Sequence, residues 1–113
     1  MTRKSGMAQA TEQLLLGSWR HSYEEDTPAQ MVYRPEDYSF PPARGRTGFA
    51  FQADKTCISL GISPRDGTAR ETCRWELVPG SPPQLNITWP NGRRETRRVI
   101  SVDPQRLVLS PPS

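Results

Sequence analysis

The segment QLNITWPNGRRETRRVISV, residues 84–102, decides the fold class. Its centre, Asn91-Gly92, is a strong hairpin signal because these two residue types readily adopt the positive φ angles of a two-residue turn. Apolar residues alternate with polar ones before the turn, and a second alternating segment follows it. Such alternation is typical of strands with one buried face. The segment therefore predicts two antiparallel strands joined by a tight turn.

The rest of the chain, from Gly17 onward, repeats this pattern. Turn signals recur at intervals of about 8 to 12 residues, which is typical of an all-β sandwich or barrel. No segment between the strands is long enough for a parallel crossover, so we expect an antiparallel meander. One short helix is predicted over residues 8–16, ending at Gly17. The eight predicted strands cover residues 17–25, 30–34, 47–53, 56–63, 69–78, 84–89, 93–102 and 106–110.

The composition fits one small globular domain. Hydrophobic residues make up 34% of the 113 residues, and the formal net charge is +3. We expect a flexible N-terminus over residues 1–7 and a single domain over residues 8–113. Twelve acidic residues are interspersed with fifteen basic ones. This charge is too mild and too mixed to indicate a nucleic-acid partner.

Targeting and metal-binding signals are missing from the sequence. The apolar run from Leu14 to Leu16 is too short for a signal peptide or a membrane span. We therefore expect a cytoplasmic protein with no membrane partner, in which Cys57 and Cys73 are reduced. No group of histidine, cysteine and carboxylate residues has the spacing of metal ligands, so we expect no metal and no cofactor.

The inward and outward faces of the strands can be assigned across each predicted turn, because paired residues on antiparallel strands point to the same side. A two-residue turn at residues 54–55 places Phe51 opposite Ile58 on the inward face. Cys57 then faces outward, whereas Cys73 lies in an inward row. We therefore expect no disulfide between the two cysteines.

The same rule divides the basic run RRETRR, residues 93–98. If the apolar residues before the Asn-Gly turn point inward, pairing across a two-residue turn brings Arg94 and Arg98 inward too. Arg93, Glu95 and Arg97 then face water. The predicted interior is therefore mostly apolar, with a minority of polar side chains that need partners.

Three short phrases of the sequence carry a resemblance to a known family. LLGSW, residues 15–19, resembles the Gly-x-Trp opening of the lipocalin and calycin barrels. FAFQADKT, residues 49–56, and CRWEL, residues 73–77, are similar to hairpin segments of small bacterial lipocalin-like domains. The likeness extends over about residues 14–109. It implies an all-β fold, namely an eight-stranded antiparallel up-and-down barrel with a short N-terminal helix.

Such a barrel has room for its own side chains or for one small ligand. We expect a small cytoplasmic lipocalin-like protein that binds an apolar or weakly anionic small molecule. The predicted ligand-binding residues lie on inward faces toward one end of the barrel: Tyr23, Leu77, Leu85, Arg98 and Val102.

Two alternatives stay open. In the first, the barrel is a cofactor-free cyclase or isomerase in which His21, Tyr23 and Arg98 orient and polarise a substrate. In the second, a filled barrel is a protein-interaction module that contacts its partner through the loop between Arg34 and Gly48. A second copy of the chain, forming a homodimer, is one such partner.

That loop contains three prolines and cannot be read as helix or strand. In one interpretation Tyr38 and Phe40 plug an end of the barrel, and the prolines limit the entropy cost of ordering the loop. In the other interpretation Tyr38, Phe40, Arg44 and Arg46 form an exposed surface that contacts a partner or a ligand.

Overall fold

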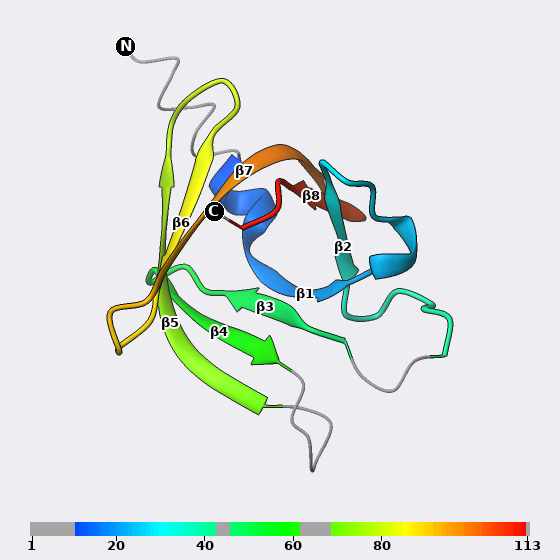
Figure 1. Cartoon of the computed structure of the whole chain (residues 1–113), viewed down its shortest axis with the longest axis horizontal. Helices are drawn as coiled ribbons and strands as arrows, with labels where there is room; N and C mark the ends of the chain where they lie inside the picture. Colours follow the sequence, from blue (N-terminus) through cyan, green and yellow to red (C-terminus); the bar gives the residue numbers. More distant parts are fainter. Residues whose placement is uncertain (1–10, 43–45, 62–68, 113) are drawn as a thin grey trace.

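The computed structural model describes residues 11–42, 46–61 and 69–112, which form a closed eight-stranded antiparallel barrel (Figure 1). Residues 11–15 are helical, so the barrel and its short N-terminal helix are confirmed. A 3₁₀ turn, η1, covers Tyr23–Glu25. The strands are β1 (Gly17–His21), β2 (Met31–Pro35), β3 (Gly48–Phe51), β4 (Thr56–Gly61), β5 (Ala69–Val78), β6 (Gln84–Thr88), β7 (Arg94–Asp103) and β8 (Arg106–Leu109).

The order of the strands around the barrel departs from a simple meander at one place. It runs β1-β2-β8-β7-β6-β5-β4-β3, so β1 lies between β2 and β3. Because β2 and β3 are both antiparallel to β1, they run parallel to each other. Parallel strands need a crossover of about a dozen residues, and residues 36–47 supply it. The expectation that no connection is long enough for a crossover is therefore wrong.

Backbone hydrogen bonds mark the path of this crossover. The amide of Glu36 donates to the Ser18 carbonyl at 3.1 Å, at the beginning of β1. At the other end of β1, the amide of His21 donates to the Thr47 carbonyl at 2.7 Å. The connection therefore travels the length of β1, and its described parts lie outside the barrel wall next to η1 (Figure 1).

The aromatic residues of the crossover pack on two nearby arginines, Arg34 of β2 and Arg46 of the crossover itself. Tyr38 and Phe40 meet edge to face at 4.9 Å between ring centroids. The guanidinium of Arg34 lies 4.7 Å from the Tyr38 ring, and that of Arg46 lies 4.5 Å from the Phe40 ring. Tyr38 and Phe40 are half-buried and are not part of the core cluster. This arrangement does not support the interpretation of the loop as a plug. Arg44 lies outside the described residues.

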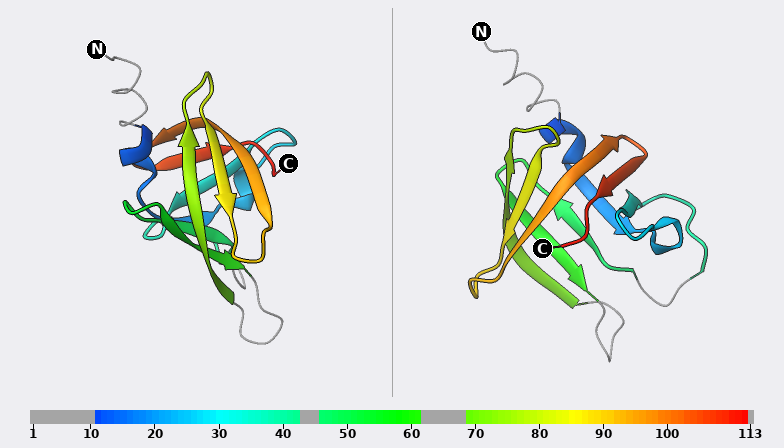
Figure 2. Two further views of the ribbon diagram at one scale, coloured as in Figure 1. Left: turned by 90° about the vertical axis from the view of Figure 1, so that its left-hand side faces the viewer. Right: turned by 45° about the horizontal axis from the view of Figure 1, so that its top comes forward.

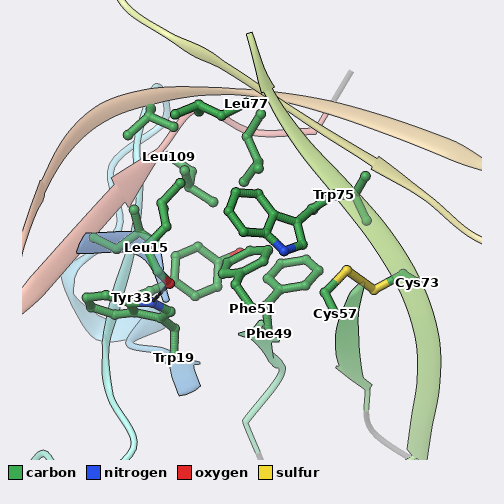
Figure 3. Close-up of a cluster of buried hydrophobic side chains, with 14 of the residues drawn as sticks. Leu15, Trp19, Tyr33, Phe49, Phe51, Cys57, Cys73, Trp75, Leu77 and Leu109 are labelled. Carbon is green, nitrogen blue, oxygen red and sulfur yellow. Dashed lines mark hydrogen bonds between the residues drawn. A yellow bond between two sulfur atoms is a disulfide. The ribbon is translucent and has the colours of Figure 1, made fainter. Parts of the chain in front are cut away.

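Aromatic and aliphatic side chains together fill the core of the barrel (Figure 3). Phe49 stacks on Phe51 at 5.4 Å between ring centroids, and Phe51 meets Trp75 edge to face at 5.4 Å. Leu15 of the helix is completely buried, and its carbonyl accepts a 2.8 Å hydrogen bond from Trp19 Nε1. Figure 2 shows the helix next to the β5–β6 turn, at the opposite end of the barrel from the β6–β7 turn. The helix therefore covers one end.

The β3–β4 turn is one residue longer than expected. The amide of Gln52 donates to the Thr56 carbonyl, and Lys55 has a positive φ of 74°. This is a three-residue loop in which a type I turn is followed by a left-handed residue. The extra residue moves the register by one, so Phe51 pairs with Cys57. Cys57 therefore points inward.

Cys57 and Cys73 pair directly across β4 and β5 and form a disulfide. Both are buried, with exposed fractions of 0% and 1%. The expectations that Cys57 faces outward and that no disulfide forms are wrong. A one-residue slip reverses every side chain of a strand, so the single extra turn residue explains both errors.

The β6–β7 turn shows the same difference. The amide of Trp89 donates to the Arg93 carbonyl, and Gly92 has a φ of 89°, so the loop contains three residues. Leu85 consequently pairs with Arg97 rather than with Arg98. Arg97 is 2% exposed, and Arg98 lies on the outer surface. The expected faces of the basic run are therefore reversed.

Candidate functional site

A hollow of about 390 Å³ opens at the end of the barrel opposite the helix. We call this end the mouth of the barrel. The topology gathers here the beginnings of β2, β3, β5 and β7 and the end of β4. The side chains that matter for its chemistry are Tyr33, Phe49, Ser59, Trp89, Glu95 and Arg97.

Two other hollows have similar volumes, about 450 and 460 Å³. The first lies by the β5–β6 turn, and the second lies on the outer wall of β5 and β6. The hollow at the mouth differs from them because the buried arginine Arg97 forms part of its wall. We therefore take the mouth as the candidate site.

Arg97 is the polar centre of the mouth. Its Nε donates to the Ser110 carbonyl at 2.6 Å, and its Nη1 donates to Glu95 Oε2 at 2.9 Å. Its Nη2 donates to Tyr33 Oη at 3.2 Å and also lies 3.2 Å from Met31 Sδ. The guanidinium thus ties β7 to β2 and to the C-terminal segment. Its charge is balanced by Glu95, whose side chain is 22% exposed.

Tyr33 connects this ion pair to the aromatic core. The ring is 2% exposed and lies 6.2 Å from Phe49 between centroids. Its other neighbour is His21, which stacks on it at 5.1 Å. Burial raises the pKa of the Tyr33 hydroxyl, and the nearby Arg97 opposes that shift. Tyr33 therefore stays a neutral phenol that accepts a hydrogen bond from Arg97.

Trp89 forms another wall of the mouth. The guanidinium of Arg93 lies 4.2 Å from the Trp89 ring centroid and donates to Glu71 Oε1 at 3.3 Å. Arg93 and Glu71 are both more than half exposed, so they form the outer rim. Trp89 itself is 4% exposed. Its buried Nε1 has no hydrogen-bond partner among the described residues.

His21 has the partner that would orient a general base, but it does not reach the hollow. Its Nε2 lies 2.7 Å from Asp26 Oδ2, and Asp26 Oδ1 accepts a 2.9 Å hydrogen bond from the Val32 amide. This group fastens the β1–β2 connection to the barrel. His21 is not among the residues that line the mouth.

Two of the predicted site residues lie outside the barrel. Tyr23 is 47% exposed because β1 ends at His21 and η1 turns the chain outward. Arg98 is exposed because of the register at the β6–β7 turn. The predicted inward positions of Tyr23 and Arg98 are therefore wrong, and His21, Tyr23 and Arg98 do not come together in the interior.

The other predicted ligand-binding residues are apolar and lie away from the hollow. Leu77 and Leu85 pair across β5 and β6 and belong to the buried core. Val102 is partly buried and packs against that core. All three help to fill the barrel, and none of them lines the mouth.

Sequence reasoning missed Tyr33, Glu95 and Arg97. A two-residue turn puts Glu95 and Arg97 on the outer surface, whereas the three-residue loop of the structure brings both to the mouth. A proline directly before Asn91-Gly92 was the available signal for a longer loop, because proline suits the first corner of a type I turn. Trp89 was correctly expected to point inward.

Arg46 of the crossover and Arg34 of β2 bind the acidic residues of η1. Arg46 bonds Glu24 Oε2 at 2.7 Å and the Pro41 carbonyl at 2.8 Å. Arg34 bonds both carboxylate oxygens of Glu25, at 2.7 and 2.9 Å. The hydrogen bond from Arg34 lowers the pKa of Glu25 from 4.5 to about 2. These bonds attach η1 to the crossover and to β2.

The lowered pKa of Glu25 predicts an acid-dependent loss of stability. The Glu25 contribution is present above pH 4.5 and is lost as the pH falls toward 2. Between pH 7 and pH 3 we expect a loss of about 1 kcal/mol from this group, after discounting for solvent screening. Urea unfolding at both pH values measures it.

The matched variants are Glu25→Gln and Glu76→Gln, the latter at an exposed position of β5. Glu25→Gln should be less stable than the wild type at pH 7 and should lose about 1 kcal/mol less on acidification. Glu76→Gln should keep the wild-type difference. Equal acid sensitivity in all three proteins would contradict the prediction.

A comparison with known protein families, curated proteins and solved structures finds no match to this chain. No helix in the described part of the chain is long and apolar enough to cross a membrane. Within residues 11–42, 46–61 and 69–112, no three histidine, cysteine or carboxylate side chains gather as a metal site would require.

Proposed function

We propose that this protein binds a small, largely apolar molecule in the mouth of the barrel. The observation that carries the proposal is the hollow of about 390 Å³, whose lining includes the aromatic residues Tyr33, Phe49 and Trp89. Ligand sites are typically concave, mostly apolar and about 300 to 1,000 Å³ in volume. The mouth is at the small end of that range, so it suits a molecule of one to three fused or linked rings.

The weakly anionic ligands that the sequence suggested are less favoured by the geometry. Arg97 would be the natural partner of an anion, but its guanidinium already bonds Glu95, Ser110 and Tyr33. An anion would compete with the Glu95 carboxylate for a cation that is almost completely buried. We therefore narrow the proposal to apolar ligands.

No observation favours the alternative of a cyclase or isomerase, because His21 lies outside the hollow and Tyr23 and Arg98 lie on the surface. A lipocalin-like ancestry and a cytoplasmic location stay predictions. The buried disulfide argues against the cytoplasm, because disulfides are typical of oxidising compartments. Contact with a partner through the crossover also stays a prediction.

Binding of N-phenyl-1-naphthylamine, an uncharged apolar fluorophore, tests the proposal. Ser59 lines the mouth and pairs with Phe49, so Ser59→Phe should fill the hollow. Thr72→Phe places the same side chain at an exposed position of β5 and is the matched control. We expect the wild type and Thr72→Phe to bind alike, and Ser59→Phe to bind at least about tenfold more weakly.

Thermal melts of the three proteins show whether each remains folded. If the wild type does not enhance the fluorescence of the probe, the proposal fails. It also fails if Ser59→Phe is folded and binds the probe as tightly as the wild type does.

A further inference from the structure

A five-residue pattern, Arg-Glu-Thr-x-Arg, occurs twice on one wall of the barrel, at residues 70–74 in β5 and at residues 94–98 in β7. Both strands flank β6 and are antiparallel to it, so they run parallel to each other (Figure 2, left). Successive side chains of a strand point to opposite faces. The glutamates, Glu71 and Glu95, border the mouth, where each pairs with an arginine. The fold therefore separates charges that are interspersed in the sequence.

The outer face of this wall carries the first and last arginines of both patterns. All four are exposed: Arg70, Arg74, Arg94 and Arg98. None of them has an ion pair within the described part of the chain, whereas the arginines that line the mouth are paired. The wall therefore presents guanidinium groups whose hydrogen-bond donors are available to a ligand.

Two carboxylates reduce the positive charge of this outer face. Glu76 is exposed on the same face of β5 as Arg74. Asp54 belongs to the β3–β4 turn, and hydrogen bonds from Thr56 lower its pKa, with a smaller contribution from the charge of Arg74. Neither carboxylate forms an ion pair with an arginine within the described residues. The face therefore keeps a net positive charge, which favours an anionic partner.

A shallow trough runs along β6 between the arginines of β5 and β7. Three hollows on this wall, of about 460, 310 and 270 Å³, share Thr88 as a lining residue. Thr88 pairs with Arg74 on one side and with Arg94 on the other. Neighbouring strands lie about 4.8 Å apart, so these two arginines are about 10 Å apart across β6. The shorter side chains of Thr88 and Asn86 form the floor, which we call the β6 trough.

We propose that the β6 trough binds the sugar–phosphate backbone of a single-stranded nucleic acid. A guanidinium group bonds two phosphate oxygens at once, so Arg74 and Arg94 suit the two sides of a bound strand. Hydroxyl and amide side chains, such as Thr88 and Asn86, are common partners of phosphate oxygens in nucleic-acid complexes. This site is separate from the mouth, and the proposal does not depend on the function proposed there.

Two features of the wall favour a single strand held by its phosphates. The outer wall of a closed barrel is convex, so a stiff duplex would touch it over a short length, whereas a flexible strand follows the trough. The aromatic residues that border the trough, Trp75 and Trp89, are 3% and 4% exposed, so they offer no ring on which a base could stack. Binding should therefore be independent of base sequence and strongly dependent on salt.

Fluorescence anisotropy of a labelled oligothymidylate of about 12 residues tests the proposal, with salt varied from about 50 to 200 mM. Four arginine–phosphate contacts predict that the logarithm of the association constant falls with the logarithm of the salt concentration with a slope of about −3. An oligoadenylate of the same length should give the same slope and an affinity within about threefold.

Two double variants with the same net charge locate the binding surface. Arg74→Gln with Arg94→Gln removes both sides of the β6 trough and should weaken binding at least about tenfold at low salt, with a slope of about −1.5. Arg20→Gln with Arg106→Gln is the matched control, because β1 lies across the barrel from β6 and Arg106 begins β8. The control should keep the wild-type slope and bind within about twofold of the wild type.

Glu76→Gln gives a change in the opposite direction. It removes a carboxylate from the edge of the β6 trough, so we expect it to tighten oligothymidylate binding about two- to threefold at low salt. A mainly structural role of this wall would not produce tighter binding. Thermal melts of all variants show that each is folded under the conditions of the titration.

Several results would overturn the proposal. One is no rise in anisotropy with the wild type at about 50 mM salt. Another is equal weakening by the two double variants, which would indicate an effect of net charge alone. Tighter binding of a duplex of the same length would show that the partner is not a single strand. Binding of a sulfated heparin fragment without binding of the oligonucleotide would assign the wall to a polysaccharide instead.

Discussion

Arg97→Ala is expected to lower the free energy of unfolding by about 3 to 5 kcal/mol, whereas Arg98→Ala, one residue further along the same strand, is expected to change it by less than about 0.5 kcal/mol. The difference follows from burial. The Arg97 side chain is 2% exposed and donates to Ser110, Glu95 and Tyr33. Arg98 is exposed.

The cost at Arg97 comes from the groups that its removal leaves behind. The Glu95 carboxylate loses its ion-pair partner, and the Tyr33 hydroxyl loses a donor inside the barrel. Removing one partner of a buried pair is strongly destabilising because the groups left behind lose a partner where water reaches them only in part. Urea unfolding near neutral pH measures both variants.

Arg97→Met separates charge from volume, because methionine keeps part of the apolar stem. Arg97→Met should recover only a minor part of the free energy of unfolding that Arg97→Ala loses, since Glu95 remains unpaired. Equal destabilisation by Arg97→Ala and Arg98→Ala, or a larger effect at Arg98, would contradict the register of β6 and β7.

Loss of the Cys57–Cys73 disulfide is expected to cost about 3 kcal/mol. The two cysteines are separated by 16 residues, and opening a loop of this size returns chain entropy to the unfolded state. The wild type should therefore be about 3 kcal/mol less stable with a phosphine reductant than without it. The double variant Cys57→Ala, Cys73→Ala should have similar stability in both conditions.

Thiol titration gives an independent measurement of the same bond. The native protein should contain no reactive thiols before reduction and two after reduction and unfolding. Two free thiols in the oxidised, denatured wild type would show that the bond is not formed. They would then also remove the argument for an oxidising compartment.

Much of the fold could be predicted from the alternation of residues and the turn signals. Each predicted strand corresponds to a strand of the barrel, and Trp19, Trp75 and Trp89 all point inward. These features depend on local pattern, and a period-two alternation survives an error of one residue in a turn. The helix before Gly17 was also correctly placed where the structure describes it.

The side-chain chemistry of the site was harder to predict because it depends on turn length. A two-residue turn and a three-residue turn differ by one residue, but they place opposite faces of the next strand in the interior. Because of that difference, Arg97 rather than Arg98 points into the barrel, and Cys57 points inward rather than outward. Lys55 gave no warning, because a lysine with positive φ is unusual.

The neighbours of β1 in the barrel could not be predicted from the local sequence pattern. Nothing in residues 17–21 distinguishes a strand beside β3 from one beside β8, and only the length of residues 36–47 hinted at a crossover. The sequence suggested a functional reason for the length of this loop, either as a plug of the barrel or as a surface that contacts a partner or a ligand. The strand order gives a simpler explanation, since a crossover needs such a length.

The crossover also determines how the ring can be assembled. β3 to β8 follow one another as a continuous six-stranded sheet. The β1–β2 hairpin lies between the two edge strands of this sheet, β3 and β8, and closes the barrel. A short link between β2 and β3 would force those two strands to pair, and β1 would then lie beside β8. The long link allows the reverse placement of the hairpin, with β1 beside β3 and β2 beside β8. Its length therefore selects between two rings that the same eight strands could build.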